Sequence, residues 1–340
     1  MATTRAARRT LRPLVFSPGW AATVALVAIA LVGLSLPPTL QYAPLVASAL
    51  VLGLPHGAVD HLAVARARGR PPDRGAVARV VALYGVVGGA YAVGWFLGPA
   101  AAFALFILVT WFHWGQGDLY VLVALADADY LRSLPQRVGT VVVRGGLPML
   151  VPLLAFPAWY RRVAETLVGR FAPEAVGALA WAFRPDVRLA LGVGYGAVVA
   201  ATLALGYVRA DDRGPWRLDA AETLGLVAYF ALVPPVLAIG VYFTLWHSLR
   251  HIARLLLVDD GAAAALRDRE PTAALARFAR DAFPLTAASL ALLAGLAVVV
   301  PNPPATVPEW VGLYLVFIAV VTLPHVVVVT IMDWEQSVWA

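Results

Sequence analysis

The 340-residue chain is 61% hydrophobic and 14% charged. About a quarter of the residues in a soluble domain are charged, so we expect a multi-pass protein of the cell membrane, with lipid as its surroundings. The chain has neither cysteine nor lysine, which excludes disulfide bonds, thiolate metal sites and the lysine Schiff base of an opsin. Its formal net charge is +6. We assign this charge to cytoplasmic loops that face anionic headgroups, not to nucleic-acid binding.

The N-terminal segment, residues 1–17, is basic and is predicted to lie in the cytoplasm. Its beginning, RAARRTLRPLVF, is similar to the start of a secretory signal. The apolar stretch from Trp20 to Leu36 is long enough to span a bilayer, however, and no small-x-small cleavage site follows it at once. We therefore expect a retained first transmembrane helix.

Residues 18–340 are predicted to form a single multi-pass transmembrane domain, an all-α helical bundle. Segments of about 20 mostly apolar residues are candidate membrane spans. The sequence contains about ten of them: 18–36, 42–65, 77–97, 100–124, 138–158, 187–208, 221–235, 237–257, 282–300 and 310–331. Pro234 and Pro235 separate the seventh from the eighth, and residues 221–257 could instead form one long kinked element.

The distribution of arginine favours ten spans with both termini in the cytoplasm. Arginines cluster at the N-terminus and after every second span, at 66–79, 132–137, 209–217 and 250–280. The opposite loops SLPPTLQ, FLGPAA and PNPPATVPEW contain none. A single element at 221–257 would move the most basic late cluster to the outside. The exception is the loop at about 159–186, which we expect to hold only a short amphipathic helix.

All six histidines lie within predicted spans: His56, His61, His113, His247, His251 and His325. A single polar side chain at membrane depth is commonly explained by a hydrogen bond between helices, but each costs a few kcal/mol to insert. Measured from the cytoplasmic ends of their spans, all except His61 fall within a slab about 8 Å thick, because a helix rises about 1.5 Å per residue. We therefore predict that these five converge on one site, with His61 nearer the inner surface.

The spacing of two histidines indicates a metal site. His247 and His251, in FTLWHSLRH, are four residues apart and share one helix face, so one helix can offer two ligands to one ion. The HxxxH pattern alone is a weak signal, and His56 and His113 at matching depth strengthen it. Imidazole ligands without thiolate suit iron, copper or zinc, and the ligand set does not choose among them.

Two carboxylates near these histidines are candidates for orienting them. Asp60 follows His56 by four residues, and Asp118 follows His113 by five in WFHWGQGD. A ligating histidine usually donates its other N–H to a carboxylate or carbonyl. In the alternative interpretation, Asp60 pairs with a loop arginine such as Arg66.

Aromatic residues crowd the same stretches of sequence. At helical spacing they are ordinary core or lipid-facing residues, and around a metal they could instead line a dry apolar tunnel. The sequence leaves both interpretations open for Trp111, Trp114, Phe243 and Trp246.

The motifs GLPHGAVDH, WFHWGQGD and FTLWHSLRH, in this order, resemble the Brp/Blh family of integral-membrane β-carotene 15,15′-dioxygenases over residues 42–331. The resemblance implies cleavage of the central double bond of β-carotene with O₂ to two all-trans-retinal, with possible hand-over of retinal to an opsin. It also implies a bound Fe²⁺ with four ligands: His56, His113, His247 and His251. His61 and His325 are left to contact a ligand or substrate, or to support the structure.

Other function classes fit some of these residues. A di-iron desaturase or hydroxylase needs more histidines, in HxxxH and HxxHH clusters, than this chain has. A b-type haem carrier could use His113 with His247. A transporter or proton channel could use Asp60, Asp118 and the histidines as a relay, and an accessory protein could deliver carotenoid or retinal without cutting it.

Overall fold

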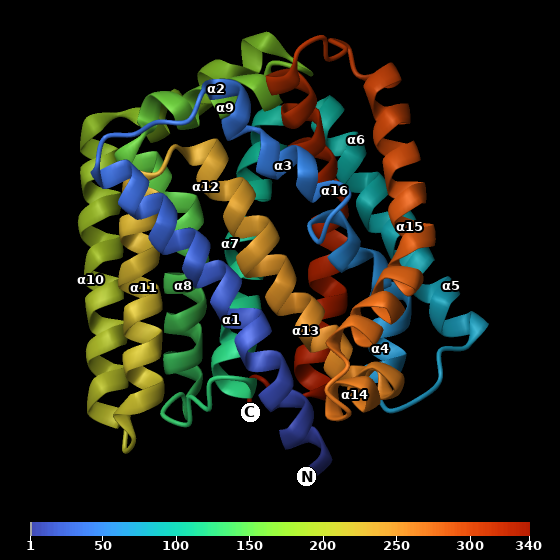
Figure 1. Ribbon diagram of the computed structural model, residues 1–340. Helices are drawn as coiled ribbons and strands as arrows, with labels where there is room; N and C mark the ends of the chain where they lie inside the picture. The colour runs from blue at the N-terminus through green and yellow to red at the C-terminus, as the bar shows by residue number, and fades with distance from the viewer. Residues whose placement is uncertain (1) are drawn as a thin grey trace.

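The computed structural model describes residues 2–340, with side chains from residue 6 onward. Met1 and the Arg5 side chain, both part of the predicted basic N-terminal segment, lie outside the described residues. The described chain forms a bundle of helices without a β-strand (Figure 1). The predicted all-α fold class is therefore confirmed.

Within the described residues, seven helices are long and apolar enough to cross a membrane. Each has at least 22 residues, which at about 1.5 Å per residue exceeds the hydrocarbon thickness of about 30 Å. The seven are α1 (Ala2–Leu31), α5–η2–α6 (Arg74–Leu83, Tyr84–Gly88 and Gly89–Leu97), α7 (Pro99–Ala124), α8 (Leu134–Ala155), α10 (Pro185–Arg209), α15 (Pro271–Val299) and α16 (Val307–Glu335). These helices support the expectation of a multi-pass membrane protein.

The predicted span at 42–65 is not one continuous helix. After α2 (Pro38–Gln41), the structure divides it into α3 (Ala43–Ser48), the 3₁₀-helical η1 (Leu54–Val59) and α4 (Asp60–Ala67). Leu52 has a left-handed φ of 62°. A Cβ on Gly53 would lie 2.5 Å from the Ser48 side chain, so only glycine allows this close approach. The break therefore lies in GLPHG, just before His56.

Residues 221–257 form two helices and not one kinked element. The first, α11 (Arg213–Leu232), ends at Val233 and Pro234, whose backbones are extended, because a proline disfavours helical geometry in the residue before it. The second runs from α12 (Pro235–Val241) through the π-helical η4 (Tyr242–Ser248) into α13 (Leu249–Val258).

The remaining helices lie at the two ends of the bundle. Near the top of Figure 1, α9 (Pro157–Val168) and the 3₁₀-helical η3 (Pro173–Phe183) occupy the loop at about 159–186, whose arginines are the exception to the predicted topology. At the opposite end, where both chain termini lie, α14 (Asp260–Arg267) packs against α1 (Figure 1). The loop at about 159–186 thus holds two short helices, where the sequence predicted one short amphipathic helix.

Glycine allows a close contact between α7 and α8. A Cβ on Gly115 would lie 2.1 Å from the Val141 carbonyl oxygen, and one on Gly145 would lie 1.8 Å from that of Trp111. Small residues at such crossings let backbones touch, as is common in membrane helix pairs. This contact fixes α7, which carries His113.

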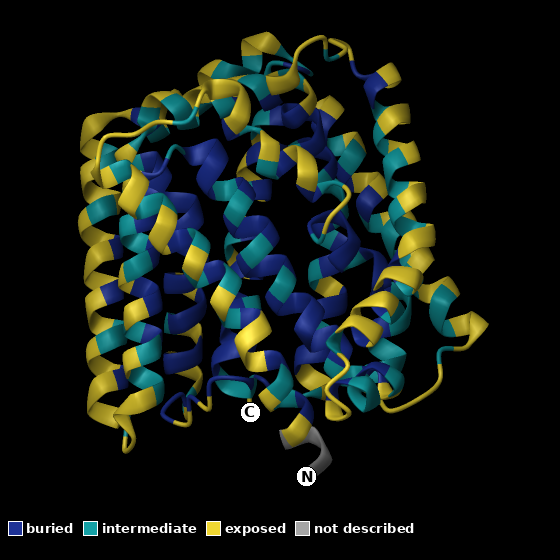
Figure 2. Cartoon of the chain, in the orientation of Figure 1, coloured by how far each residue is buried: buried dark blue, intermediate teal, exposed yellow. Residues whose placement is uncertain are grey.

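The outer surface of the bundle is apolar. Exposed residues cover the outward faces of α10 and α15 (Figure 2), and they include large side chains such as Leu189 and Val298, which are 69% and 81% exposed. A water-soluble monomer rarely exposes apolar surface on this scale. The surface is therefore suited to lipid.

Candidate metal centre

Five of the six histidines lie together in the interior of the bundle. Each comes from a different helical element: His56 from η1, His113 from α7, His247 from η4, His251 from α13 and His325 from α16. All five are buried, with at most 7% of their surface exposed. The ring centres of six neighbouring pairs are 4.7 to 5.4 Å apart. We call these five residues the histidine cluster.

The break in GLPHG positions His56. Its Nδ1 donates a hydrogen bond to the Gly53 carbonyl and lies 3.2 Å from the Ser248 hydroxyl. A histidine that donates from Nδ1 keeps the lone pair on Nε2. His56 therefore has the tautomer that suits a metal ligand through Nε2.

Two glycines and a π-helical segment make room for the other rings. A Cβ on Gly57 would lie 3.5 Å from the His325 ring, and a Cβ on Gly117 would lie 3.5 Å from the His247 ring. His247 is the sixth residue of η4, the π-helical segment Tyr242–Ser248. Such segments are rare and frequently occur at functional sites.

The histidine cluster contains buried nitrogens that lack hydrogen-bond partners: Nδ1 and Nε2 of His113, and Nε2 of His247, His251 and His325. Leaving such a group unsatisfied costs about 1–3 kcal/mol. Candidate ligand atoms of His56, His113 and His325 all lie within 4.8 Å of one another, and so do those of Asp60, His251 and His325. The side chains present therefore fit a bound metal ion, which would satisfy these nitrogens.

Asp60 contacts a histidine, but not the one that sequence spacing indicated. Its Oδ2 lies 2.7 Å from Nδ1 of His325 and accepts a hydrogen bond from the Tyr84 hydroxyl at 2.6 Å. The four-residue spacing indicated the wrong partner for Asp60. His56 and Asp60 belong to different helices, η1 and α4, and therefore do not share a helix face. The alternative pairing with Arg66 is also absent, because Arg66 forms its ion pairs with two other carboxylates at 2.6 and 3.0 Å.

Asp118 lies in a separate buried network and makes no hydrogen bond to His113. It accepts hydrogen bonds from Trp246 and Arg250, each at 3.2 Å, and lies 3.5 Å from Arg144. Five residues correspond to about 140° of rotation around an α-helix, so Asp118 faces away from the ring of His113. The expectation that it orients His113 was wrong.

Sequence reasoning missed the rest of this network. Arg144 donates to Asp219 and Glu222 at 2.9 and 2.8 Å, and Glu222 also accepts from Arg250 at 2.5 Å. These side chains join α8, α11 and α13. The sequence did contain a signal for this network, namely charged residues inside apolar spans. Because burying a charge without a partner is costly, such residues indicate buried ion pairs. We call Asp118, Arg144, Asp219, Glu222 and Arg250 the ion network.

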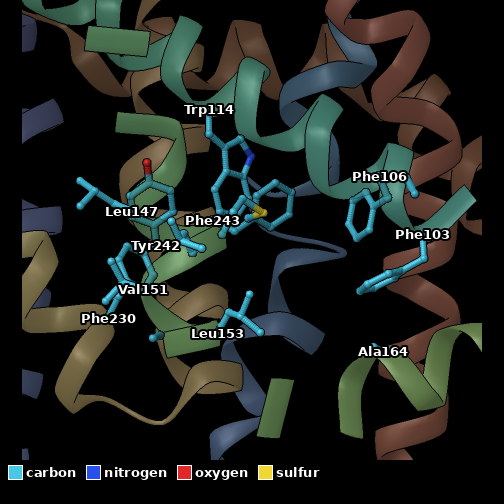
Figure 3. Packing of buried hydrophobic residues seen from close by; sticks show 14 of the residues in the cluster. Phe103, Phe106, Trp114, Leu147, Val151, Leu153, Ala164, Phe230, Tyr242 and Phe243 are labelled. Carbon is cyan, nitrogen blue, oxygen red and sulfur yellow. The ribbon is translucent and has the colours of Figure 1, made fainter. Parts of the chain in front are cut away.

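Two of the four candidate aromatic residues adjoin the histidine cluster. Trp114 lies 5.5 Å from the His247 ring and Phe243 lies 5.6 Å from the His56 ring, measured between centres. Trp114 and Phe243 stack on each other (Figure 3). Trp111 and Trp246 have other roles: Trp111 donates to a carbonyl of α8 at 2.8 Å, and Trp246 stacks under a guanidinium of the ion network.

A cavity of about 880 Å³ opens beside the histidine cluster. Its walls are mostly apolar and come from helices that include α6, α7, α9, α15 and α16; Phe103 and Phe106 on α7 belong to them (Figure 3). Four histidines of the cluster (His56, His113, His247 and His325) line it, together with Asp60 and the half-buried His61, whose Nδ1 lies 3.1 Å from the Ala58 carbonyl. The cavity has the size and lining of a site for an apolar ligand.

Comparison with known proteins gives the family. The profile of the family described as "Beta-carotene 15,15'-dioxygenase" matches residues 47–333, which include all six histidines. The "Probable beta-carotene 15,15'-dioxygenase Blh" of Halobacterium salinarum is 51% identical over 98% of this chain and 96% of its own length. The "Probable beta-carotene 15,15'-dioxygenase Brp" of the same species is 36% identical over 90% of this chain and 88% of its own length. No solved structure matches the chain. The chain therefore belongs to the β-carotene 15,15′-dioxygenase family.

Proposed function

We propose that this protein cleaves the central 15,15′ double bond of β-carotene with O₂ to give two molecules of all-trans-retinal. The C15=C15′ bond breaks, each carbon becomes an aldehyde carbon, and one O₂ molecule balances the two oxygen atoms. The observation that carries the proposal is a buried histidine cluster that opens onto a large apolar cavity. The names of the Blh and Brp relatives agree with it.

We further propose that Fe²⁺ is the metal, bound by His56, His113, His247 and His251. When bound, Fe²⁺ supplies the redox chemistry by which O₂ reacts with an otherwise unreactive polyene. The unpartnered nitrogens of His113, His247 and His251 support this ligand set. The hydrogen bond from His56 to the Gly53 carbonyl keeps Nε2 of His56 available.

The remaining side chains of the site bind and orient the substrate. The apolar cavity holds the polyene and excludes water, while the stacked Trp114 and Phe243 form the wall next to the cluster. Holding one double bond at the metal selects the position of cleavage, since proximity and orientation supply much of the rate. β-Carotene dissolves in the bilayer, so the apolar outer surface suits entry from the lipid.

For the membrane arrangement we propose ten spans within a single domain at 18–340, with both termini in the cytoplasm. The interrupted segment 42–65 and the two helices of residues 213–258 would supply the three spans beyond the seven long apolar helices. Both chain termini lie at the same end of the bundle (Figure 1), as an even number of spans requires. The arginines of α9 would lie at the opposite membrane surface.

The proposal is tested in bacteria that accumulate β-carotene. Expression of the chain should turn β-carotene into retinal, measured by chromatography of extracted pigment. His113→Ala should abolish the conversion, and Asp186→Asn, which alters an exposed residue outside the cavity, should retain it. Unchanged β-carotene without retinal, in membranes that contain the folded, metal-loaded protein, would refute the proposed function.

A further inference from the structure

We infer that His325 is a fifth protein ligand of the metal and that Asp60 and Tyr84 orient it for this role. The inference rests on the proposed function only in requiring that a metal occupies the histidine cluster. It differs from the ligand set of four that the sequence motifs imply, in which His325 has no assigned role.

The position of the His325 ring is that of a ligand. Its centre lies 4.7 Å from that of His113, 5.0 Å from that of His251 and 5.1 Å from that of His56. With a metal–nitrogen distance of about 2.1 Å, two imidazoles bound at a right angle have centres about 4.7 Å apart, and two opposite imidazoles have centres about 6.6 Å apart. The His113 and His251 rings are 6.5 Å apart. His113 and His251 are therefore spaced as two ligands on opposite sides of a metal would be. His325 lies next to each of them at the spacing expected for neighbouring ligands.

The nitrogens of His325 agree with this position. Nε2 is buried and has no hydrogen-bond partner. His325 belongs to both groups of side chains whose candidate ligand atoms lie within 4.8 Å of one another, with His56 and His113 in one and with Asp60 and His251 in the other. No other histidine belongs to both groups. A purely structural role for His325 would leave its Nε2 unsatisfied in the interior.

The other side of the ring is held by a carboxylate. Nδ1 of His325 donates to Asp60, which is 1% exposed and also accepts the Tyr84 hydroxyl. Donation from Nδ1 leaves the lone pair of His325 on Nε2, toward the cluster. A carboxylate behind a ligating imidazole fixes its orientation and raises its basicity, and removing such a partner typically costs 10–100-fold in metal affinity. Asp60 and Tyr84 are therefore positioning residues.

The test uses purified full-length protein in detergent, stripped with a chelator and reloaded with Co²⁺. Co²⁺ content per chain and the visible d–d absorption report occupancy and coordination number. For His325→Ala we expect either loss of bound Co²⁺ or a changed d–d spectrum. His61→Ala, which alters a histidine that lines the same cavity outside the cluster, should match the unaltered protein in both readouts.

A second variant covers the case in which His325→Ala fails to fold. Asp60→Asn keeps the shape of the side chain but removes its charge, and it should lower Co²⁺ affinity about 10–100-fold. Unchanged Co²⁺ content and spectrum in His325→Ala, or unchanged affinity in a folded Asp60→Asn, would overturn the inference.

Retinal formation by the unaltered protein, measured in the same preparations, separates this inference from the proposed function. Absence of retinal together with a spectrum that depends on His325 would refute the function and leave the ligand assignment in place. Retinal formation together with a spectrum that does not depend on His325 would refute only the assignment.

Discussion

The guanidinium of Arg250 donates to both carboxylate oxygens of Glu222, at 2.5 and 3.2 Å, and neither side chain is more than 2% exposed. Arg250 lies between His247 and His251 in sequence, on the helix that supplies both to the cluster. The pair therefore ties this helix to α11 close to the two histidines that the helix supplies.

Breaking this pair should destabilise the protein strongly. Glu222→Gln removes the carboxylate that Arg144 and Arg250 share, although Asp219 and Asp118 still pair with them. Losing a hydrogen bond to a charged group typically costs about 1.5–3 kcal/mol. The midpoint of thermal unfolding in detergent measures the effect. Asp186→Asn is the control, because Asp186 pairs with Arg184 where both side chains are more than 60% exposed, and such pairs contribute at most about 1 kcal/mol. Equal losses in the two variants would contradict this role of the ion network.

Removing any one of the four proposed ligands should abolish retinal formation and lower the bound metal. Each would leave the metal with one imidazole fewer at a buried site. The variants are alanine substitutions at His56, His113, His247 and His251, and metal content and retinal are measured on the same purified samples. Near-normal turnover and metal content in any one of them would remove that residue from the ligand set.

The crossing of α7 and α8 should tolerate no side chain at Gly145. A Cβ there would lie 1.8 Å from the Trp111 carbonyl, so Gly145→Ala must push α7 and the attached His113 away. We expect a lower yield of folded protein and less bound metal in what remains. Gly194→Ala on α10 is the matched control, since a Cβ there meets no atom within 4 Å. A folded, fully metal-loaded Gly145→Ala would show that this crossing does not fix the site.

Filling the cavity should slow cleavage without removing the metal. Ser289 on α15 lines the cavity and is not a member of the histidine cluster, so Ser289→Trp should obstruct the polyene. We expect slower retinal formation with an unchanged metal content. Ala287→Trp adds the same volume to an exposed position on the same helix that does not line the cavity, and it should cleave normally. If both variants cleave normally, the substrate lies elsewhere.

The sequence predicted the elements whose signals are local. Long apolar runs correctly indicated helices such as α7 and α16, and the two prolines at 234 and 235 correctly separated α11 from α12. The interruption at 42–65 went unpredicted, although Gly53 and Pro55 are residues that break helices. Hydropathy alone does not distinguish a continuous span from a broken one.

In the candidate site, too, local patterns predicted some features correctly and missed a contact between distant residues. The depth of each histidine in its span predicted that five of them converge, and the structure brings those five together. The partner of Asp60 was not predictable in this way, because His325 is 265 residues away and local spacing says nothing about such a contact. The rotation of Asp118 away from His113 follows from helix geometry alone and could have been predicted.

The most direct test of this account is the product formed by purified, metal-free protein after Fe²⁺ is added back in the presence of β-carotene and O₂. We expect no product before Fe²⁺ is added, and retinal as the sole cleavage product afterwards, because the proposed site holds one double bond at the metal. Retinal formed equally well without metal, or none formed by protein shown to have bound Fe²⁺ at the histidine cluster, would contradict it.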